Sequence, residues 1–482
     1  MTIARSRQRA QRLEARDSPR SNVPAHNPQT GVSMTGHATR VARDHCLAPA
    51  RVDAPLSGGR YRSLFEDLAP LRVDETALHG LGRPGGPCDL GAGTAGDTDS
   101  HVAAVWPFFG QFIAHDITAD RSPLAHRATP ARLRNARAPK ADLEGLYGAG
   151  PVGMPYLYRA DDPAKLLLSP EGSDVPRNQE GIALVGDPRN DVHLFTSQMA
   201  VAFIGLHNRL VDRLRDDGVA DQDVFDEARR ATMWHYHHVI LREFLPGLIG
   251  TELTAELLGR GPRLYRPAAD PYIPLEFADA AYRYGHAQIR DRYQVNARFG
   301  PCPLFPDLMG FGPVPPEHTV DWTLQIDVEG HAPAQRSKRI DPRLAAPLIS
   351  LPTRVSGSAP GTDYASLANR DLQRGQAVGL ASGEAIAHRL GVPALSAEQV
   401  GLAEHGWVGE TPLWFYVLRE ADVRHDGDRL GPVGGRIVGE VLVGIIDADP
   451  ESFRSVDPGW TPTSPARRAG AFGLADILVP GL

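Results

Sequence analysis

Apolar residues recur at helical spacing in several long segments of this chain. Residues 194–217, LFTSQMAVAFIGLHNRLVDRLRDD, give the strongest pattern, in which acidic residues follow the apolar face. Similar helical patterns cover residues 222–245, 276–290 and 366–391, and residues 396–424 and 433–448 carry two further apolar stretches. Alternating strand patterns are few and no internal repeat is found. The sequence therefore predicts a mainly α-helical fold.

The stretches without this pattern suggest how the chain is organised. Residues 1–55 are rich in Arg, Ser and Pro, which predicts a disordered or wrapping arm. Residues 119–185 are dense in Pro, Gly and Asp, which predicts a long irregular segment. We expect one large helical domain over residues 56–455, with long loops and few short strands. A C-terminal tail, residues 456–482, should pack on it.

One apolar run, WPFFGQFIAHDITAD at residues 106–120, carries polar side chains that a buried helix normally avoids. Gln111 and His115 are four positions apart and share one face of a helix, while Asp116 points about 100° away. One helical turn would therefore present an amide and an imidazole to one cavity and a carboxylate to a different place.

Two other segments also carry a polar side chain within or next to an apolar helical pattern. GDPRND places Arg189 in a turn before a buried helix, and YRYGHAQIRDRY places His286 after a glycine in an amphipathic segment. A single such histidine is usually a satisfied core residue, but the combination matches the needs of peroxide cleavage at a haem iron. One imidazole holds the iron, and the other takes a proton from H2O2 and returns it to the leaving oxygen. A guanidinium stabilises the developing negative charge.

These segments identify a family resemblance. FFGQFIAHDIT, GDPRND followed by LHNRL, and YRYGHAQI resemble the animal haem peroxidase family, within the peroxidase–cyclooxygenase superfamily, over roughly residues 60–450. PVGMPYLYRADDPAKLLL and DLQRGQAVGL are similar to its bacterial members. The resemblance implies a helical haem-peroxidase fold and a haem-dependent peroxidase. Such an enzyme reduces H2O2 while it oxidises a small organic or halide donor.

The resemblance also implies individual roles. His115 matches the distal acid–base, Gln111 its companion on the same face, and Arg189 the distal arginine. His286 matches the axial ligand of the haem iron, and Arg283 matches an arginine that pairs with a haem propionate.

A calcium site is implied next to the distal histidine. Asp116 matches the family's calcium-binding aspartate, and Asp142 and Glu144 in APKADLEGLYG fall at ligand positions. The carbonyls of Ala138 and Lys140 complete the implied set, although the family usually has a hydroxyl residue where Ala138 stands. Hard oxygen ligands of this kind suit Ca2+.

Two departures from the family change the expected chemistry. Mammalian members esterify haem through two acidic residues, whose positions here hold Ala114 and Val192, so haem b should be bound noncovalently. The family also hydrogen-bonds its axial histidine to an asparagine, and aligning DLQRGQAVGLASGEA puts Glu384 there. A carboxylate at that place would add imidazolate character to the axial ligand.

A fatty-acid oxygenase on the same scaffold is the first alternative function. Those enzymes need a tyrosine three residues before the axial histidine, where this chain has Arg283. Tyr282 and Tyr284 flank that position, and we expect them to point elsewhere on the helix. The peroxidase is therefore favoured.

Other functional classes fit the sequence less well. A metallohydrolase is suggested by MWHYHH at 233–238, but a pair of histidines four apart with an acid between them is absent, which favours a helix-surface cluster. His207 and Asn208 are expected to be structural. A haem-binding sensor or an inactive homologue is disfavoured because the complete distal set is present.

Composition narrows the partners and the compartment. A net charge of −7 over 482 residues does not indicate nucleic acid as a partner. The spacing of Cys46, Cys88 and Cys302 excludes a disulfide scaffold and a c-type haem, and it suggests a reducing compartment. The apolar run 436–448 is too short for a membrane span and is interrupted by Glu440. With no signal-peptide pattern at the N-terminus, we expect a cytoplasmic protein.

Overall fold

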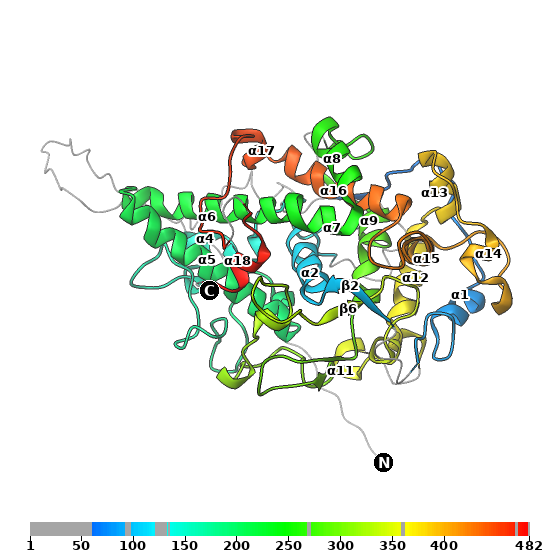
Figure 1. Cartoon of the computed structure of the whole chain (residues 1–482), viewed down its shortest axis with the longest axis horizontal. Helices are drawn as coiled ribbons and strands as arrows, with labels where there is room; N and C mark the ends of the chain where they lie inside the picture. Colours follow the sequence, from blue (N-terminus) through cyan, green and yellow to red (C-terminus); the bar gives the residue numbers. More distant parts are fainter. Residues whose placement is uncertain are drawn as a thin grey trace, which may run out of the picture. The chain divides into compact units, whose positions relative to one another are not determined.

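Helices dominate the part of the chain that the computed structural model describes (Figure 1). That part comprises residues 60–91, 98–120, 133, 135–267, 271–357, 362–467 and 471–480. The predicted N-terminal arm lies outside it. The prediction of a mainly helical fold with few short strands is confirmed.

Helix α2, Val105–Ile117, packs against the long helix α5, Leu194–Asp216, and against a 3₁₀ helix, Ala281–Gln288. The aromatic residues of α2 explain this position. The ring of Phe109 is fully buried and meets the rings of Tyr236 and Phe244 edge-on, at centroid distances of 6.1 and 5.5 Å. Such edge-to-face contacts add to the burial of apolar area. The helix that carries Gln111 and His115 is therefore fixed from several sides.

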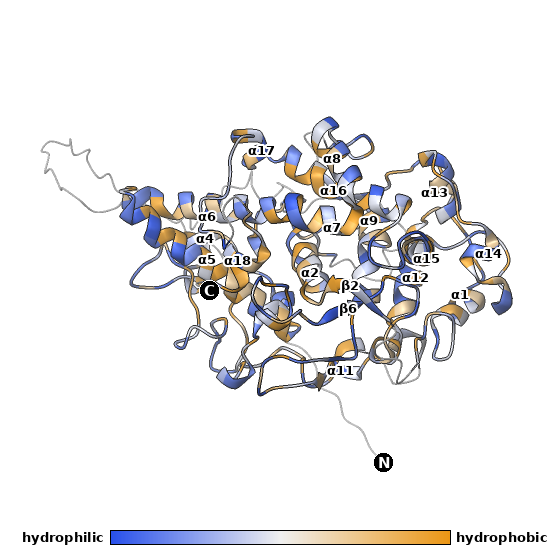
Figure 2. Cartoon of the chain, in the orientation of Figure 1, coloured by the Kyte–Doolittle hydropathy of each residue, from blue (hydrophilic) through white to orange (hydrophobic). Residues whose placement is uncertain are grey.

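Helix α5 starts one residue after His193, whose imidazole accepts a hydrogen bond from the Phe195 amide. It is followed by α6, Asp221–Val239, a π-helical turn, Ile240–Phe244, and α7, Leu245–Ile249. Along α5 and α6 hydrophobic and hydrophilic colours alternate in Figure 2, as expected for helices with one buried face. The prediction of helices over 194–217 and 222–245 is confirmed.

The other α-helices are α1 Glu75–Gly82, α3 Glu144–Tyr147, α4 Gly150–Gly153, α8 Thr251–Arg260, α9 Leu275–Ala278, α10 Ala346–Ile349, α11 Thr353–Ser356, α12 Leu367–Val378, α13 Gly383–Leu390, α14 Ala397–Val400, α15 Leu413–His425, α16 Pro432–Ala448, α17 Phe453–Val456 and α18 Leu474–Leu478.

Strands form only two-stranded pairings in the described chain. β1, Arg60–Arg62, pairs in parallel with β3, Tyr272–Pro274. The antiparallel pairs are β2 Asp99–Ala103 with β6 Arg336–Lys338 and β4 Arg292–Tyr293 with β5 Cys302–Pro303.

Helix α16 shows how a small residue lets helices approach closely. A Cβ added at Gly439 would lie 2.5 Å from a methyl carbon of Leu257 and 2.6 Å from one of Ile249. Glycine at this position therefore lets α16 pack on α7 and α8 without displacing these methyl groups. Glu440 is also fully buried there, and it accepts hydrogen bonds from the amides of Arg263 and Leu264.

None of the helices in the described residues combines the length and the apolar character that a membrane-spanning helix needs.

The segment 276–290 differs from the single helix that its pattern predicts. α9 ends at Ala278, and a separate 3₁₀ helix runs from Ala281 to Gln288. A 3₁₀ helix has three residues per turn, so Arg283 and His286 fall on the same face. The change of helix type therefore places the side chain of Arg283 next to that of His286.

Candidate active site

A cavity of about 490 Å³ brings together the segments that the sequence singled out. It is bordered by α2, by the turn Pro188–Asp191 and by the 3₁₀ helix Ala281–Gln288. The predicted site residues that line it are Gln111, His115, Arg189, Arg283 and His286. Glu384 is not among the lining residues. Residues that are far apart in the chain lie close together here: His115 and Asn190, 75 positions apart, are hydrogen-bonded.

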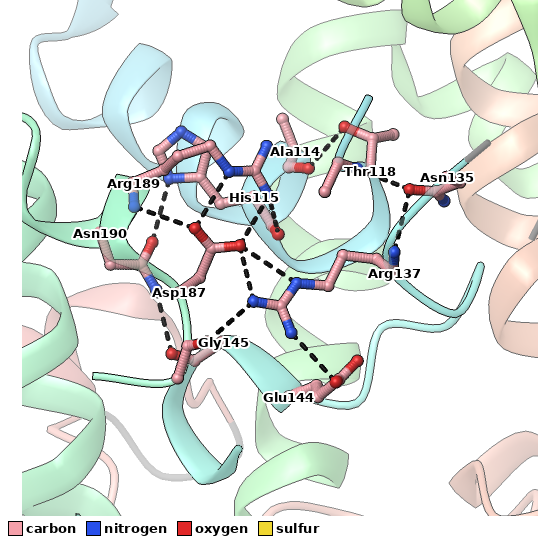
Figure 3. A network of polar contacts seen from close by, with 12 residues as sticks. Ala114, His115, Thr118, Asn135, Arg137, Glu144, Gly145, Asp187, Arg189 and Asn190 are labelled. Atoms are coloured by element: carbon pink, nitrogen blue, oxygen red, sulfur yellow. Dashed lines mark hydrogen bonds and ion pairs between the residues drawn. The ribbon is translucent and has the colours of Figure 1, made fainter. Parts of the chain in front are cut away.

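His115 is buried and is held by an amide. Its Nδ1 lies 3.0 Å from Oδ1 of Asn190, so Nδ1–H donates and Nε2 is left with its lone pair (Figure 3). Burial, together with the charge of nearby Arg189, lowers the pKa of His115 to about 4. The imidazole is therefore neutral at neutral pH and can accept a proton.

Arg189 is fixed next to this histidine by Asp187. Its Nε donates to Oδ1 of Asp187 at 3.0 Å, and its Nη2 donates to Oδ2 at 2.8 Å and to the His115 carbonyl at 2.8 Å (Figure 3). Nη1 makes no hydrogen bond to any residue that the structure describes. The same Asp187 also accepts a 2.6 Å hydrogen bond from Arg137. Although burial raises it, the pKa of Asp187 is held far below its usual range by the two guanidiniums.

His286 has a different kind of partner. Its Nδ1 lies 2.6 Å from Oδ2 of Asp371, and the other oxygen of that carboxylate accepts a hydrogen bond from Arg283 Nη1 at 3.0 Å. Asp371 is fully buried. Burial raises the pKa of this carboxyl, but His286 and Arg283 more than offset that effect, so the pKa lies below its usual range. A charged carboxylate thus holds the second histidine.

The prediction that Glu384 supports the axial histidine is wrong. Glu384 lies in the first turn of α13, where its oxygens accept hydrogen bonds from the amide and the hydroxyl of Thr411 at 2.9 and 2.6 Å. The carboxylate at His286 belongs to Asp371, the first residue of the DLQRGQAVGL segment. The aligned segment therefore contained the correct carboxylate. The spacing of residues alone could not choose between Asp371 and Glu384, which lie on neighbouring helices.

The predicted orientation of two tyrosines is also wrong. Tyr282 and Tyr284 both line the cavity, because the 3₁₀ helix turns its residues differently from an α-helix. Burial raises the pKa of both phenols well above the ordinary range. The hydroxyl of Tyr282 is buried and has no hydrogen-bond partner in the described chain.

The implied calcium ligands are only partly brought together. One oxygen of buried Asp116 accepts from the Leu143 amide at 3.0 Å, and the other is buried with no hydrogen-bond partner within the described ranges. Burial and then the charge of Asp142 raise the pKa of Asp116 well above its usual value. The carboxylate of Glu144 pairs with Arg137 at 3.1 Å, so its role as a calcium ligand stays a prediction. Nowhere in the described chain do three His, Cys, Asp or Glu side chains form a metal-binding group.

The histidine cluster of α6 is not on the surface. His235 and His237 are fully buried, and Nε2 of His235 accepts hydrogen bonds from the amides of Thr463 and Ser464 at 3.1 and 3.0 Å. The C-terminal part of the chain covers this face of α6, which the pattern of α6 alone could not indicate. The structural role expected for His207 is confirmed, since its ring lies 3.0 Å from the Tyr147 hydroxyl.

The animal haem peroxidase family profile matches residues 129–307. This match and the peroxidase relatives support the resemblance to the animal haem peroxidases that the sequence motifs indicate. Thyroid peroxidase of Sus scrofa is 30% identical over 176 residues, which cover 36% of this chain and 19% of that protein. The chain spans 8–19% of the length of four curated relatives that it matches.

Two solved structures share the fold over most of the chain. Peroxidase A from Dictyostelium discoideum superposes with a TM-score of 0.61 at 14% identity, covering 87% of this chain and 91% of that one. The fatty acid alpha-dioxygenase of Arabidopsis thaliana superposes with a TM-score of 0.54 at 16% identity, covering 79% and 70%. At these identities the likeness concerns the fold alone.

The residues present fit a haem group. The cavity volume lies within the range of about 300–1,000 Å³ that is typical of cofactor sites. Its wall combines two histidines with apolar side chains such as Phe108, Phe277 and Ile289. His286 has its Nδ1 engaged by Asp371, which leaves Nε2 as the donor atom available for an iron.

Proposed function

We propose that this protein is a peroxidase that reduces H2O2 with a small-molecule reducing substrate and uses noncovalently bound haem b. The observation that carries the proposal is the pair of histidines on one cavity, each with its own partner. His115 is held by the amide of Asn190, and His286 by the carboxylate of Asp371. A bound haem would supply the redox-active iron that the cleavage of peroxide requires.

The side chains on the His115 side would handle the proton of the peroxide. Neutral His115 would accept a proton at Nε2 from one oxygen of H2O2 and return it to the other oxygen, which leaves as water, while the two electrons that break the O–O bond would come from a bound haem. Arg189, fixed by Asp187, places a permanent positive charge beside the group that becomes negative. Gln111 lines the same cavity one helical turn from His115 and can orient the peroxide through its amide.

On the other side, His286 would hold the iron through Nε2. Asp371 fixes the tautomer and the plane of this ring, because its carboxylate accepts the Nδ1–H at 2.6 Å. A charged acceptor makes the imidazole a stronger electron donor than a neutral one.

Noncovalent attachment is supported by the composition of the cavity wall. Ala114 and Val192 line the cavity, and no Asp or Glu occurs among its lining residues in the described chain. None of the described lining residues therefore offers a carboxylate that could form an ester with haem. Extraction of the purified protein with acid and organic solvent should release all of the haem. Haem that stays on the denatured chain would contradict this part of the proposal.

The activity itself is tested with the intact protein. Absorption spectra should show a haem band, and H2O2 should drive the oxidation of phenols or halides, with each peroxide consumed balanced by two electrons from the donor. A preparation without haem, or one in which peroxide oxidises no donor, would overturn the proposal.

A fatty-acid oxygenase remains the second candidate, and one observation favours it. Tyr282 lines the cavity with a buried hydroxyl that has no hydrogen-bond partner in the described chain, which makes this phenol the candidate hydrogen-abstracting residue. Oxygen uptake with palmitate in the absence of added donor distinguishes the two functions. Loss of that uptake in Tyr282→Phe, but not in Tyr284→Phe, would support the oxygenase.

We further propose that Asp116 and Asp142 hold Ca2+, with carbonyl oxygens completing the ligands. The support is the buried carboxylate oxygen of Asp116 with no hydrogen-bond partner in the described chain, close to the partly buried carboxylate of Asp142. Calcium should raise the melting temperature, a chelator should lower it, and Asp142→Asn should remove both responses. Glu144→Gln is the matched control, since Glu144 pairs with Arg137. An unchanged calcium response in Asp142→Asn would refute the site.

A further inference from the structure

The wall of the cavity carries an excess of positive charge. Four arginines line it, namely Arg189, Arg283, Arg354 and Arg370. No Asp or Glu is found among the lining residues that the structure describes. A cavity with several cationic groups and no acidic one favours an anionic occupant.

Two of the four guanidiniums are paired with carboxylates behind the wall. Arg189 is paired with Asp187 at 2.8 Å, and Arg283 is bonded to Asp371 at 3.0 Å. The Nε of Arg283 also donates to the Ala278 carbonyl at 2.8 Å. Arg283 is the residue that the family resemblance assigns to a haem propionate, but its guanidinium is already engaged by groups of the protein.

The other two arginines have no carboxylate partner within the described chain. Arg370, in α12, donates from Nε to the Tyr364 carbonyl at 2.6 Å and from Nη2 to the Ser356 carbonyl at 2.5 Å. These neutral acceptors hold the guanidinium in place but leave its charge uncompensated. Arg354, in α11, is exposed and makes no hydrogen bond or ion pair to a described residue.

The surroundings of Arg370 increase its need for an anion. Burial and the charge of Arg374 lower the pKa of this guanidinium more than the charge of nearby Asp371 raises it, so its surroundings disfavour the charged form. Leu351, Val355 and Leu367 line the cavity close in sequence to the two arginines. The wall therefore offers cationic groups and apolar surface together, which suits an organic carboxylate with an apolar body.

We infer that Arg354 and Arg370 form a carboxylate-binding site on the wall of the cavity. The bound carboxylates could have two sources with the same chemistry: the propionates of haem, or the carboxylate of an organic reducing substrate. The inference rests on the proposed function for the identity of these sources. It assigns to α11 and α12 the role that the family resemblance gives to Arg283.

The test separates carboxylate binding from iron binding. The full-length chain, produced without haem, is titrated with protoporphyrin IX, which has two propionates but no iron, and with its dimethyl ester, which has no carboxylate. Arg354→Gln and Arg370→Gln should each weaken protoporphyrin binding by about tenfold or more, the loss expected for one charge-assisted contact. Binding of the dimethyl ester should not change. Arg370→Lys keeps the charge and should lose less affinity than Arg370→Gln.

Two variants protect the test from a trivial structural effect. Arg354 is exposed and makes no hydrogen bond or ion pair to a described residue, so Arg354→Gln remains informative if Arg370→Gln is unstable. Arg429→Gln is the matched control, because Arg429 is also exposed and has no hydrogen bond or ion pair within the described residues but lies outside the cavity.

A second arm uses the haem-loaded protein and compares 4-hydroxybenzoate with phenol as the reducing substrate. If the carboxylate comes from the substrate, the variants should raise KM for 4-hydroxybenzoate about tenfold and leave phenol and protoporphyrin unchanged. Variants that match Arg429→Gln in both arms would overturn the inference. A protein that binds protoporphyrin through these arginines, yet shows no histidine-ligated haem spectrum, would overturn the proposed function and leave the carboxylate site standing.

Discussion

The two sides of the cavity use the same side chain with different supports. His115, on a regular α-helix, gives its Nδ1 proton to the neutral amide of Asn190. His286, on a 3₁₀ helix, gives its Nδ1 proton to the charged carboxylate of Asp371. The difference suits opposite tasks, since a proton carrier must remain free to be neutral, whereas an iron ligand benefits from added electron density.

The comparison also teaches where charge is placed. On the His115 side, the carboxylate of Asp187 is directed to Arg189 and Arg137 and does not touch the histidine. Arg189 instead helps to lower the pKa of His115. A positive charge lies beside His115 and a negative charge beside His286. The two histidines therefore have different electrostatic surroundings although they are the same residue type.

The largest effect should come from His286→Ala. This side chain supplies the only protein bond to iron in the proposed site, so the variant should lose stoichiometric haem and all peroxidase activity. Haem content measured from the absorption spectrum of the purified protein checks this, with His115→Ala as the control that keeps its haem. A full haem complement with an unaltered spectrum in His286→Ala would show that another residue holds the iron.

His115→Ala should leave haem bound but slow its reaction with H2O2. The expected loss is about 10²–10⁴-fold, the usual contribution of a positioned acid–base group. Stopped-flow absorbance after mixing with H2O2 measures this rate directly. His207→Gln, a change at another buried histidine outside the cavity, serves as the control. A wild-type rate in His115→Ala would remove the distinction between the two sides.

Asp371→Asn tests the charged support by making it resemble the neutral support of His115. The variant keeps a hydrogen-bond acceptor for His286 but removes the negative charge. We expect a rise in the iron reduction potential and about a 10–100-fold loss of activity, as for other residues that support metal ligands. Glu384→Gln is the matched control, because sequence spacing favoured Glu384 for this role. Equal potentials in wild type and Asp371→Asn would mean that the carboxylate has only a structural function.

The smallest effect concerns pH. Because His115 must be neutral to accept a proton and its pKa is lowered to about 4, the rate with H2O2 should be constant at neutral pH and should fall as pH drops through about 4.

The same shift affects stability. A histidine with an ordinary pKa of 6.5 in the unfolded chain and about 4 in the folded one stabilises the fold fully above pH 6.5. That contribution is lost progressively as pH falls from 6.5 to about 4. His193, His207, His235 and His237 have pKa values lowered in the same direction by burial. Melting temperatures should therefore fall as pH is lowered from 6.5 to about 4. A melting temperature that stays constant over this range would contradict these pKa shifts.

Local sequence determined the helices and the residue types of the proposed site. Apolar spacing placed α5 at Leu194–Asp216 with an error of one residue, because its buried face is encoded by neighbours in the chain. His115, Arg189 and His286 stood out as polar groups in apolar or turn segments, and the structure brings all three to one cavity.

Only the tertiary structure decided the partners of these residues. Asn190 and Asp371 lie 75 and 85 positions from the histidines that they hold, so no local pattern could choose Asp371 over Glu384. The burial of His235 depends in the same way on a C-terminal segment more than 200 positions away. Short-range periodicity fixes which face of a helix is buried, whereas hydrogen-bond partners depend on the packing of whole elements, which the spacing of residues along one segment does not contain.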